Sequence, residues 1–519
     1  MRVAECPHRP AGWSSRRCPR RAGDRGVGVA ARWKMKRSGP WARLSSNRYH
    51  CRRSSDHEMD GQMAASADLP IQAPASELKD RDRKYVIHPH QRADRDERHI
   101  IVRGKGSTVW DAEGNEYLDA MGSANWMGQV GHARPELAEA AAEQMAELQY
   151  FTGFDVYSNE PSIRLAERLA GLAPEGIDRV FFTNGGSEGV DSAFKAARLF
   201  HFRRGEPDRT WIISRRLAYH GCTYGSGTAS GFDLVQHGFG PNLPNVEKVT
   251  PPLPFHSELY GGQHPTDFLV NELEQTIERI GAGNIAAMIG EPVMGGAGVV
   301  PPPDDYWPRI REVLSAHGIL LIADEVVTSY GRTGVWFESQ RRGMNADIIV
   351  TSKGLTSGYM PLGAVLIRNG IADAITEAEG FFHGHTYFGH PVACAVAMAN
   401  LDVLEREGLL DRAKQIGEWF EADLAPAREF PTVGEVRVAG ATAGIELVAD
   451  RQSREPLLAG AAAVSAELRR AHHVIVRDYN ATVVLAPPLV LERSQARQIS
   501  EAIVEVVSRL RGDGTLSPR

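Results

Sequence analysis

The chain has no run of 18 apolar residues, about the minimum that a membrane-spanning helix needs. It is also poor in cysteine, with five in 519 residues, and three of these fall within the first 53. The other two, Cys222 and Cys394, are far apart in the sequence and give no disulfide framework. Such cysteine usage is typical of a reducing compartment. We therefore expect a cytoplasmic protein without a membrane partner.

Acidic residues are scarce at the N-terminus, where only Glu5 and Asp24 accompany the 15 lysines and arginines of the first 53 residues. The rest of the chain has 44 basic and 63 acidic residues, so the formal charge of −6 hides this imbalance. The basic segment has little apolar content and no helical or strand periodicity, which predicts disorder. Residues 1–80 are therefore expected to form a disordered basic extension and arm.

Three explanations of the basic segment stay open. An organelle transit segment is rich in arginine and serine and poor in acids, as this segment is. A nucleic-acid-binding tail would carry aromatic residues interleaved in a pattern with the basic ones, and this segment shows no such pattern, so we expect no nucleic-acid partner. The favoured explanation is upstream sequence read from an early start codon, with Met59 or Met63 beginning the working protein. A chain that starts at Met59 is then expected to fold and react like the full chain.

The body of the chain is too long for one ordinary core, and its pattern changes along its length. Between about residues 160 and 370, short continuous apolar runs such as 285–289 and 319–323 alternate with helical patterns. Continuous apolar strands predict an α/β fold with a mainly parallel sheet that helices cover on both faces. The later part of the chain indicates a smaller α+β domain, to which an N-terminal hairpin contributes. The predicted domains are a large domain over 131–394 and a small domain over 81–130 and 395–519.

Lys353 follows a strand-like apolar run at 346–350 and is surrounded by glycines and hydroxyl residues. A lysine at the end of a buried strand is costly unless it is paired or neutral. A neutral amine is what a Schiff base with an aldehyde requires, so Lys353 is a candidate for covalent catalysis. The alternative is a lysine that turns to solvent at the strand end.

Three further candidates follow predicted strands, at the edge where doubly wound sheets bind their ligands. The turn at Ser187 precedes a helix and suits a phosphate, unless Ser187 is an ordinary N-cap. Tyr219 can offer an aromatic face, unless it is a loop tyrosine. Asp324, which lies 29 residues before Lys353, needs a cationic partner, unless it caps a helix or forms an ordinary salt bridge. Lysine, aspartate, phosphate-binding turn and aromatic residue together predict a pyridoxal 5'-phosphate site.

Six short motifs occur in order along the chain. They are FFTNGGSE at 181–188, YHG at 219–221, EPV at 291–293, ADEV at 323–326, SKG at 352–354 and TYFGHP at 386–391. From about residue 80 to its end, the chain resembles the class III, or omega, aminotransferases of the type I pyridoxal phosphate fold. One position departs from that family, which usually has Ser-Gly-Ser where this chain has Gly185, Gly186 and Ser187. Because the backbone amides remain, the cofactor is still expected to bind.

The resemblance implies a role for each matching residue around the cofactor ring. Lys353 would form the Schiff base with the cofactor and later shuttle the proton, and Asp324 would keep the pyridine nitrogen protonated. Tyr219 and Val326 would enclose the ring from its two faces. His220, next to Tyr219 in the same motif, counts among the cofactor-binding residues.

The resemblance also implies contacts around the phosphate. Gly186 and Ser187 would bind this group, and Glu291 would order the site without touching the ring. Thr386 would reach the phosphate of the neighbouring subunit. The resemblance therefore implies a homodimer or a dimer of dimers, and no metal ion is expected.

Two residues point to the substrate. Trp126 matches an aromatic residue that walls the substrate pocket in the pyruvate-using branch of the family. Arg477 matches a mobile arginine that pairs with the carboxylate of the acceptor, for which a guanidinium fork is well suited. The alternatives are a core tryptophan and a surface arginine. Tyr150 is a third candidate for the substrate pocket.

The reaction that the resemblance implies moves an amino group from a primary amine or ω-amino acid to a 2-oxo acid, expected to be pyruvate. The amino group would rest on the cofactor as pyridoxamine phosphate between the two halves of a ping-pong reaction. An aminomutase, racemase or decarboxylase would share Lys353 and Asp324, so these reactions stay open. A non-catalytic scaffold would need neither residue. The sequence leaves the amine donor open, from β-alanine and taurine to 4-aminobutyrate or a polyamine.

Overall fold

The structure, a computed structural model, describes residues 73–90 and 97–519. The expectations for residues 1–72, including the basic segment, lie outside the described residues. The last part of the expected arm is helical, because α1 (Ala75–Tyr85) is rich in charged helix formers with pairing one turn apart. No helix in the described part of the chain is long and apolar enough to cross a membrane.

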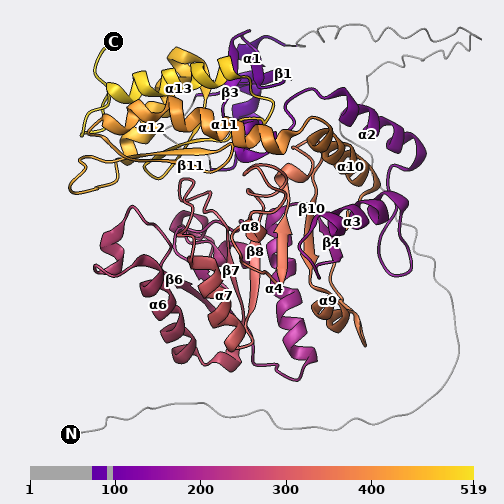
Figure 1. Ribbon diagram of the computed structural model, residues 1–519. Helices are drawn as coiled ribbons and strands as arrows, with labels where there is room; N and C mark the ends of the chain where they lie inside the picture. The colour runs from indigo at the N-terminus through magenta and orange to yellow at the C-terminus, as the bar shows by residue number, and fades with distance from the viewer. Residues whose placement is uncertain (1–72, 91–96) are drawn as a thin grey trace, which may run out of the picture. The chain divides into compact units, whose positions relative to one another are not determined.

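Seven strands form the largest sheet, in the order β4-β10-β9-β8-β7-β5-β6 (Figure 1). Strands β5 to β9 pair in parallel, whereas β10 is antiparallel to both of its neighbours, β4 and β9. The predicted α/β fold with a mainly parallel sheet is therefore confirmed. The strands are β4 (Arg179–Thr183), β5 (Trp211–Arg215), β6 (Val246–Val249), β7 (Ile285–Gly290), β8 (Leu320–Asp324), β9 (Ile348–Thr351) and β10 (Gly363–Ile367).

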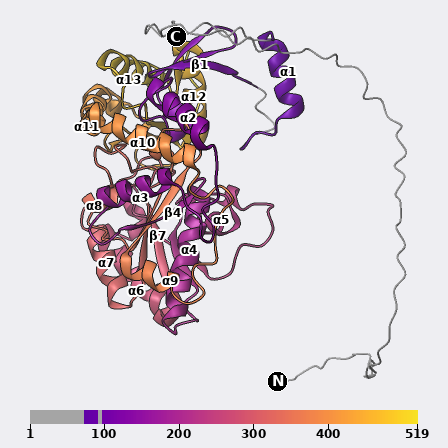
Figure 2. The ribbon, with the colours of Figure 1, turned by 90° about the vertical axis from the view of Figure 1, so that its right-hand side faces the viewer.

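Helices cover both faces of this sheet. Successive residues of each strand face opposite sides, and both sides of these strands are apolar. Ile348 packs into the core on the side of α4 (Gly186–Arg203), whereas Ile349 packs into the core on the side of α6 (Pro265–Ile280) and α7 (Tyr306–Ala316). Figure 2 shows α6 and α7 on one side of the sheet and α4 on the other. The remaining helices of this region are α3 (Glu160–Leu172), α5 (Tyr224–Ala229), α8 (Glu338–Arg341) and α9 (Asn369–Thr376).

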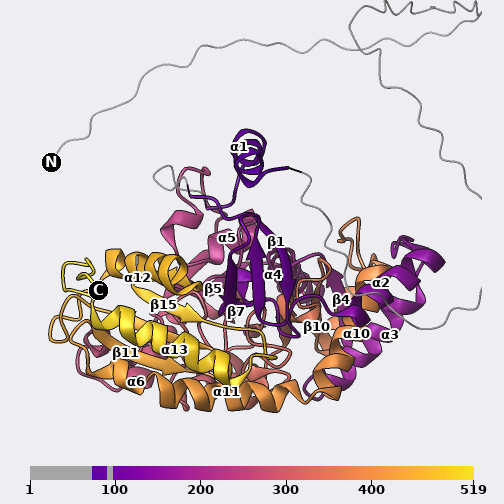
Figure 3. The same ribbon diagram turned by 90° about the horizontal axis from the view of Figure 1, so that it is seen from above.

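Two four-stranded sheets, β1-β2-β3-β13 and β11-β12-β15-β14, form the rest of the fold with α11, α12 and α13 (Figure 3). Strand β13 lies parallel to β3, which joins the N-terminal hairpin to the C-terminal part of the chain. Helix α10 packs against α2 and α3. The division at residues 130 and 394 stays a prediction. The strands are β1 (Ile101–Lys105), β2 (Thr108–Asp111), β3 (Glu116–Asp119), β11 (Val433–Val438), β12 (Ala443–Leu447), β13 (Val474–Ile475), β14 (Arg477–Tyr479) and β15 (Thr482–Leu485). The helices are α2 (Pro135–Leu148), α10 (Pro391–Arg406), α11 (Leu409–Asp423), α12 (Leu458–His472) and α13 (Arg493–Ser508).

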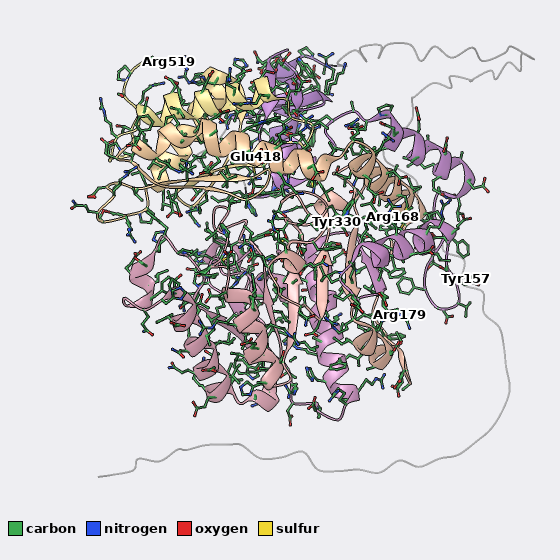
Figure 4. The ribbon with its side chains drawn as sticks, viewed as in Figure 1. Tyr157, Arg168, Arg179, Tyr330, Glu418 and Arg519 are labelled. Atoms are coloured by element: carbon green, nitrogen blue, oxygen red, sulfur yellow. The ribbon has the colours of Figure 1, made fainter. Side chains whose placement is uncertain are left out.

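The carboxyl ends of the parallel strands meet at one edge of the large sheet. Tyr330, labelled in Figure 4, is fully buried near this edge, and its hydroxyl donates a hydrogen bond of 2.9 Å to Thr351 Oγ1 at the end of β9. Asp324 is the last residue of β8, and Lys353 lies two residues after the last residue of β9. The fold therefore brings the two predicted catalytic side chains to the same edge.

Candidate active site

Lys353 begins a short 3₁₀ turn (Lys353–Leu355), which is separated from the end of β9 by one residue. Its φ of +37° is left-handed, a conformation that residues other than glycine rarely adopt and that is often found at functional positions. The pKa of Lys353 is lowered to about 8, chiefly by burial; the charge of Asp324 opposes this shift, and the charge of Arg477 adds to it. The side chain keeps some exposure to solvent. Lys353 is thus more readily neutral than a surface lysine, as an attacking amine must be.

Asp324 is held in place by two hydrogen bonds. His220 Nδ1 lies 2.7 Å from Asp324 Oδ2, and the Val326 amide donates a bond of 3.1 Å to Asp324 Oδ1. The side chain of His220 is fully buried, and its Nε2 has no partner among the described residues. The side-chain partner of Asp324 is therefore a histidine that lies 104 residues away in the sequence but adjacent in space. An anionic carboxylate fixed in this way can hold a protonated pyridine nitrogen.

Glu291 is paired with a buried arginine that the sequence analysis did not single out. Arg215, the last residue of β5, is fully buried and donates a bond of 2.9 Å from Nη2 to Glu291 Oε2. Glu291 Oε1 accepts a bond of 3.2 Å from the Tyr219 amide. Glu291 thus fixes the backbone of Tyr219, and burial raises the pKa of the Tyr219 phenol, which keeps it neutral. A charged residue at the end of an apolar strand was the available sequence signal for Arg215.

Two glycines, Gly186 at the start of α4 and Gly221 after β5, leave no room for a larger residue. A Cβ on Gly186 would lie 2.9 Å from the side chain of Val326, and a Cβ on Gly221 would lie 2.4 Å from Ser187 Oγ. Ser187 Oγ accepts a bond of 3.2 Å from the Cys222 amide, and the N-cap of α4 is Gly185. The interpretation of Ser187 as an ordinary N-cap is therefore wrong. The first-turn amides of α4 remain for an anion.

The departure at Gly185 is compatible with this turn. A Cβ added to Gly185 would meet nothing within 4 Å, so the family's serine would fit there but the fold does not require it. Glu188 holds the turn instead, because its Oε2 accepts bonds of 2.8 Å and 3.0 Å from the amide and side-chain nitrogens of Asn184. The turn keeps its geometry without a side chain at position 185.

Trp126 and Arg477 come together through a residue that the sequence analysis missed, Tyr479. Trp126 Nε1 donates a bond of 3.1 Å to the Tyr479 hydroxyl, and the guanidinium carbon of Arg477 lies 5.5 Å from the centre of the Tyr479 ring. Arg477 Nη1 donates a bond of 3.2 Å to the carbonyl of Ala124. Trp126 is 3% exposed, and Arg477 is partly buried. The strand spacing of Arg477 and Tyr479, two residues apart, was the signal for a shared face.

Tyr150 and Thr386 lie next to each other. The Tyr150 hydroxyl donates a hydrogen bond to the Thr386 carbonyl, and the Tyr150 ring contacts Tyr387 and His390. Within the described residues, no hydrogen bond or ion pair joins either residue to Lys353. The contacts of Tyr150 therefore link it to Thr386 and to the residues just before α10.

The residues at the sheet edge fit pyridoxal 5'-phosphate. A lysine of lowered pKa, a buried carboxylate, an aromatic side chain and a close-packed glycine turn at a helix N-terminus match its aldehyde, pyridine nitrogen, ring and phosphate. When bound, this cofactor withdraws electrons from the bond that breaks at the substrate carbon.

The pKa of Lys353 gives a prediction about cofactor uptake. We expect the rate at which the apoprotein binds pyridoxal 5'-phosphate covalently to rise with pH, with a midpoint near pH 8, because only the neutral amine attacks. Stopped-flow absorbance would measure this rate. Asp324→Asn should move the midpoint to lower pH, because the charge of Asp324 raises the pKa of Lys353. A midpoint near 10.5, the ordinary lysine value, would contradict the burial of this amine.

Comparison with known proteins gives a consistent result. The family model described as aminotransferase class-III matches residues 91–507. A putrescine–pyruvate aminotransferase of Pseudomonas aeruginosa is 37% identical over 405 residues, which cover 77% of this chain and 88% of the relative. The resemblance found in the sequence is therefore confirmed, and this relative supports the pyruvate-using branch.

Solved structures agree with the sequence comparison. An (S)-enantioselective omega-transaminase from Thermomicrobium roseum is 42% identical with a TM-score of 0.80, and the match covers 83% of this chain and 98% of that one. An amine transaminase from an uncultivated Pseudomonas species, solved in its PLP-bound form, is 39% identical with a TM-score of 0.78. The match covers 81% of this chain and 97% of that one. The predicted type I fold and the pyridoxal phosphate cofactor are confirmed.

Proposed function

The chain belongs to the class III aminotransferases, and from this premise we propose that it transfers an amino group from a primary amine or ω-amino acid to pyruvate. The observation that carries the proposal is the position of Arg477. Its charge acts on Lys353, yet within the described residues no carboxylate forms an ion pair with Arg477. An arginine without an anionic partner near the reacting amine suits the carboxylate of a 2-oxo acid.

The two substrates would use one site in turn, in a ping-pong reaction. Lys353 would take the proton from the substrate carbon in one half and return it in the other, while the amino group rests on the cofactor as pyridoxamine phosphate. Asp324, oriented by His220, would hold the proton on the pyridine nitrogen in both halves. Since both halves need the same lysine and carboxylate, the acceptor differs from the amine chiefly in its need for Arg477.

The residues around the ring would fix the cofactor rather than react. Tyr219 and Val326 would pack against the ring, and Glu291 would keep Tyr219 in place through its amide bond. The first-turn amides at Gly186 and Ser187 would bind the phosphate. Loss of any of these contacts should weaken cofactor binding more than it changes the reaction of the bound cofactor.

Replacement of Arg477 should separate the two half-reactions. We expect Arg477→Ala to remove about 2 kcal/mol or more of transition-state stabilisation in the pyruvate half-reaction, because a charge-assisted contact is lost. This corresponds to a rate at least roughly 30-fold lower. The half-reaction with a carboxylate-free amine should change much less. Single-turnover rates for each half would measure this. Arg454, which also lies over an aromatic ring but forms an ion pair with Glu258, provides a control as Arg454→Ala. Equal losses in both halves would mean that Arg477 supports the structure.

The amine donor can be found with the same absorbance signal. The relative from Pseudomonas aeruginosa is named for putrescine, and we propose that a diamine or another amine with a distant polar group is used here. A panel of amines, mixed one by one with the cofactor-loaded protein in the absence of an acceptor, would rank the donors by half-reaction rate. The proposal would be wrong if no primary amine converted the cofactor.

We also propose a homodimer, or a dimer of dimers, as the active unit. Large apolar side chains are exposed on two loops, with Phe154 and Tyr157 between α2 and α3, and Phe382 and Tyr387 between α9 and α10. Figure 4 shows Tyr157 on a loop at the edge of the molecule. Thr386 lies on the second loop, where it could reach a partner's phosphate. Analytical ultracentrifugation would test the assembly, and a fully active monomer would contradict it.

The cytoplasm is the proposed location. In the described part of the chain the two cysteines, Cys222 and Cys394, are free thiols. Burial raises the pKa of Cys394 to about 12, so this thiol is unreactive, whereas Cys222 is exposed. A reducing compartment would keep Cys222 as a thiol, and cell fractionation would test the location.

A further inference from the structure

Tyr479 holds Arg477 without offering it a negative charge. The two residues lie at alternate positions of β14 (Arg477–Tyr479), so their side chains share one face. The guanidinium carbon of Arg477 lies 5.5 Å from the ring centre of Tyr479, within the range of about 6 Å over which a cation is attracted to an aromatic face. Its Nη1 donates to the carbonyl of Ala124. A ring and a carbonyl are weak partners for a guanidinium, and a carboxylate can displace them.

Tyr479 is itself fixed. Its hydroxyl accepts the bond from Trp126 Nε1, and the two ring centres are 6.1 Å apart. Trp126 is buried at 3% exposure, and Tyr479 packs against the apolar cluster that contains it. Strand β14 pairs with β15, with Tyr479 opposite Thr482 and Arg477 opposite Val484. The ring is thus a rigid support, whereas Arg477 is held only at its end.

An aromatic support for Arg477 lowers the cost of binding a carboxylate in a site that must also accept an amine. Arginine loses much rotamer freedom when it binds a carboxylate, and this cost falls if the side chain already lies at the site. A carboxylate support would compete with the substrate and would bury a charge beside Lys353. An aromatic ring attracts the guanidinium without either effect.

We propose that Tyr479 is a positioning residue that keeps Arg477 at the site between acceptors and thereby sets the preference for 2-oxo acids over uncharged carbonyl compounds. The proposal rests on the proposed role of Arg477 in binding the acceptor. Tyr479 acts through Arg477 and does not touch the reacting atoms. Its removal should weaken carboxylate binding while leaving the rate at saturating acceptor nearly unchanged.

The test compares pyruvate with propanal, an acceptor of similar size that lacks a carboxylate. Single-turnover rates of the amine-loaded enzyme would be measured over a range of each acceptor for wild type, Tyr479→Leu, Tyr479→Met and Tyr479→Phe. We expect the leucine and methionine variants to require about five to ten times more pyruvate for half-saturation, with no such change for propanal. Tyr479→Phe keeps the ring and should stay within about twofold of wild type. Two non-aromatic variants are used so that the test can still be read if one of them does not fold.

A binding measurement without turnover accompanies the kinetics. Propanoate, an unreactive carboxylate, would be titrated into the cofactor-loaded enzyme and followed by the cofactor absorbance. Its dissociation constant should rise by the same five- to tenfold in Tyr479→Leu and should not change in Tyr479→Phe. In an Arg477→Ala background, Tyr479→Leu should have no further effect on either measurement, because the residue through which it acts is gone.

The outcomes separate this inference from the proposed function. Equal losses with pyruvate and propanal would show that Tyr479 has a structural role, and an undiminished effect in the Arg477→Ala background would show that it acts independently of Arg477. Either result overturns the inference. If Arg477→Ala itself leaves the pyruvate-to-propanal preference unchanged, the proposed acceptor role of Arg477 fails and the inference fails with it. If Arg477→Ala removes that preference and Tyr479→Leu keeps it, only the inference is wrong.

Discussion

Lys353→Ala is expected to reduce turnover by on the order of 10⁵ or more, while the protein stays folded and soluble. The loss is large because the amine both holds the cofactor and moves the proton, and groups that act as a unit cannot be replaced by their neighbours. The absorbance band of the lysine-bound cofactor should disappear as well. Steady-state rates, the cofactor spectrum and circular dichroism of the variant would measure these effects.

A second lysine of the same sheet serves as the control for this replacement. Lys248 lies on β6, and burial lowers its pKa too, but it is at the edge of the sheet away from β8 and β9. Lys248→Ala should keep both the absorbance band and the turnover. If Lys353→Ala transaminates near the wild-type rate, the assignment of Lys353 is wrong.

Asp324→Asn should be the next most damaging change. We expect it to raise the activation free energy by about 4 kcal/mol, which lowers turnover roughly a thousandfold. Asparagine keeps the shape but removes the charge, so the protonated pyridine nitrogen would lose its counter-charge in a buried site. The bond from His220 can persist with the amide oxygen, which should preserve the fold. Rates of both half-reactions and the thermal midpoint would be measured.

The control is a buried carboxylate at the opposite end of a neighbouring strand. Asp347 precedes β9, is 6% exposed and pairs with Arg311 at 2.5 Å. Asp347→Asn should lower the thermal midpoint without slowing either half-reaction per folded molecule. Comparable losses of turnover in the two variants would show that Asp324 acts through stability alone.

The fold was predictable where burial on both faces leaves a clear pattern. The apolar runs at 285–289 and 319–323 became β7 (Ile285–Gly290) and β8 (Leu320–Asp324) within one residue. The direction of β10 was not predicted, because an apolar strand has the same composition in either direction. The 11 residues between β9 and β10 are too few for the helical crossover that parallel neighbours need, so the sequence did contain a signal.

The site was predictable where residues follow strands and lie at one edge by topology. That rule brought together Lys353, Asp324 and Tyr219. It could not reveal Arg215 or Tyr479, because their hydrogen-bond partners are 76 and 353 residues away and no local pattern records such contacts. Side-chain networks that join distant segments require the three-dimensional structure.

The central claim is that this chain delivers an amino group to pyruvate. The most direct test mixes protein loaded with pyridoxamine phosphate with a single equivalent of pyruvate and no other substrate. We predict that the cofactor returns to its aldehyde form and that one equivalent of alanine appears at the same rate. Unchanged cofactor and no alanine, with the protein folded and loaded, would contradict the claim.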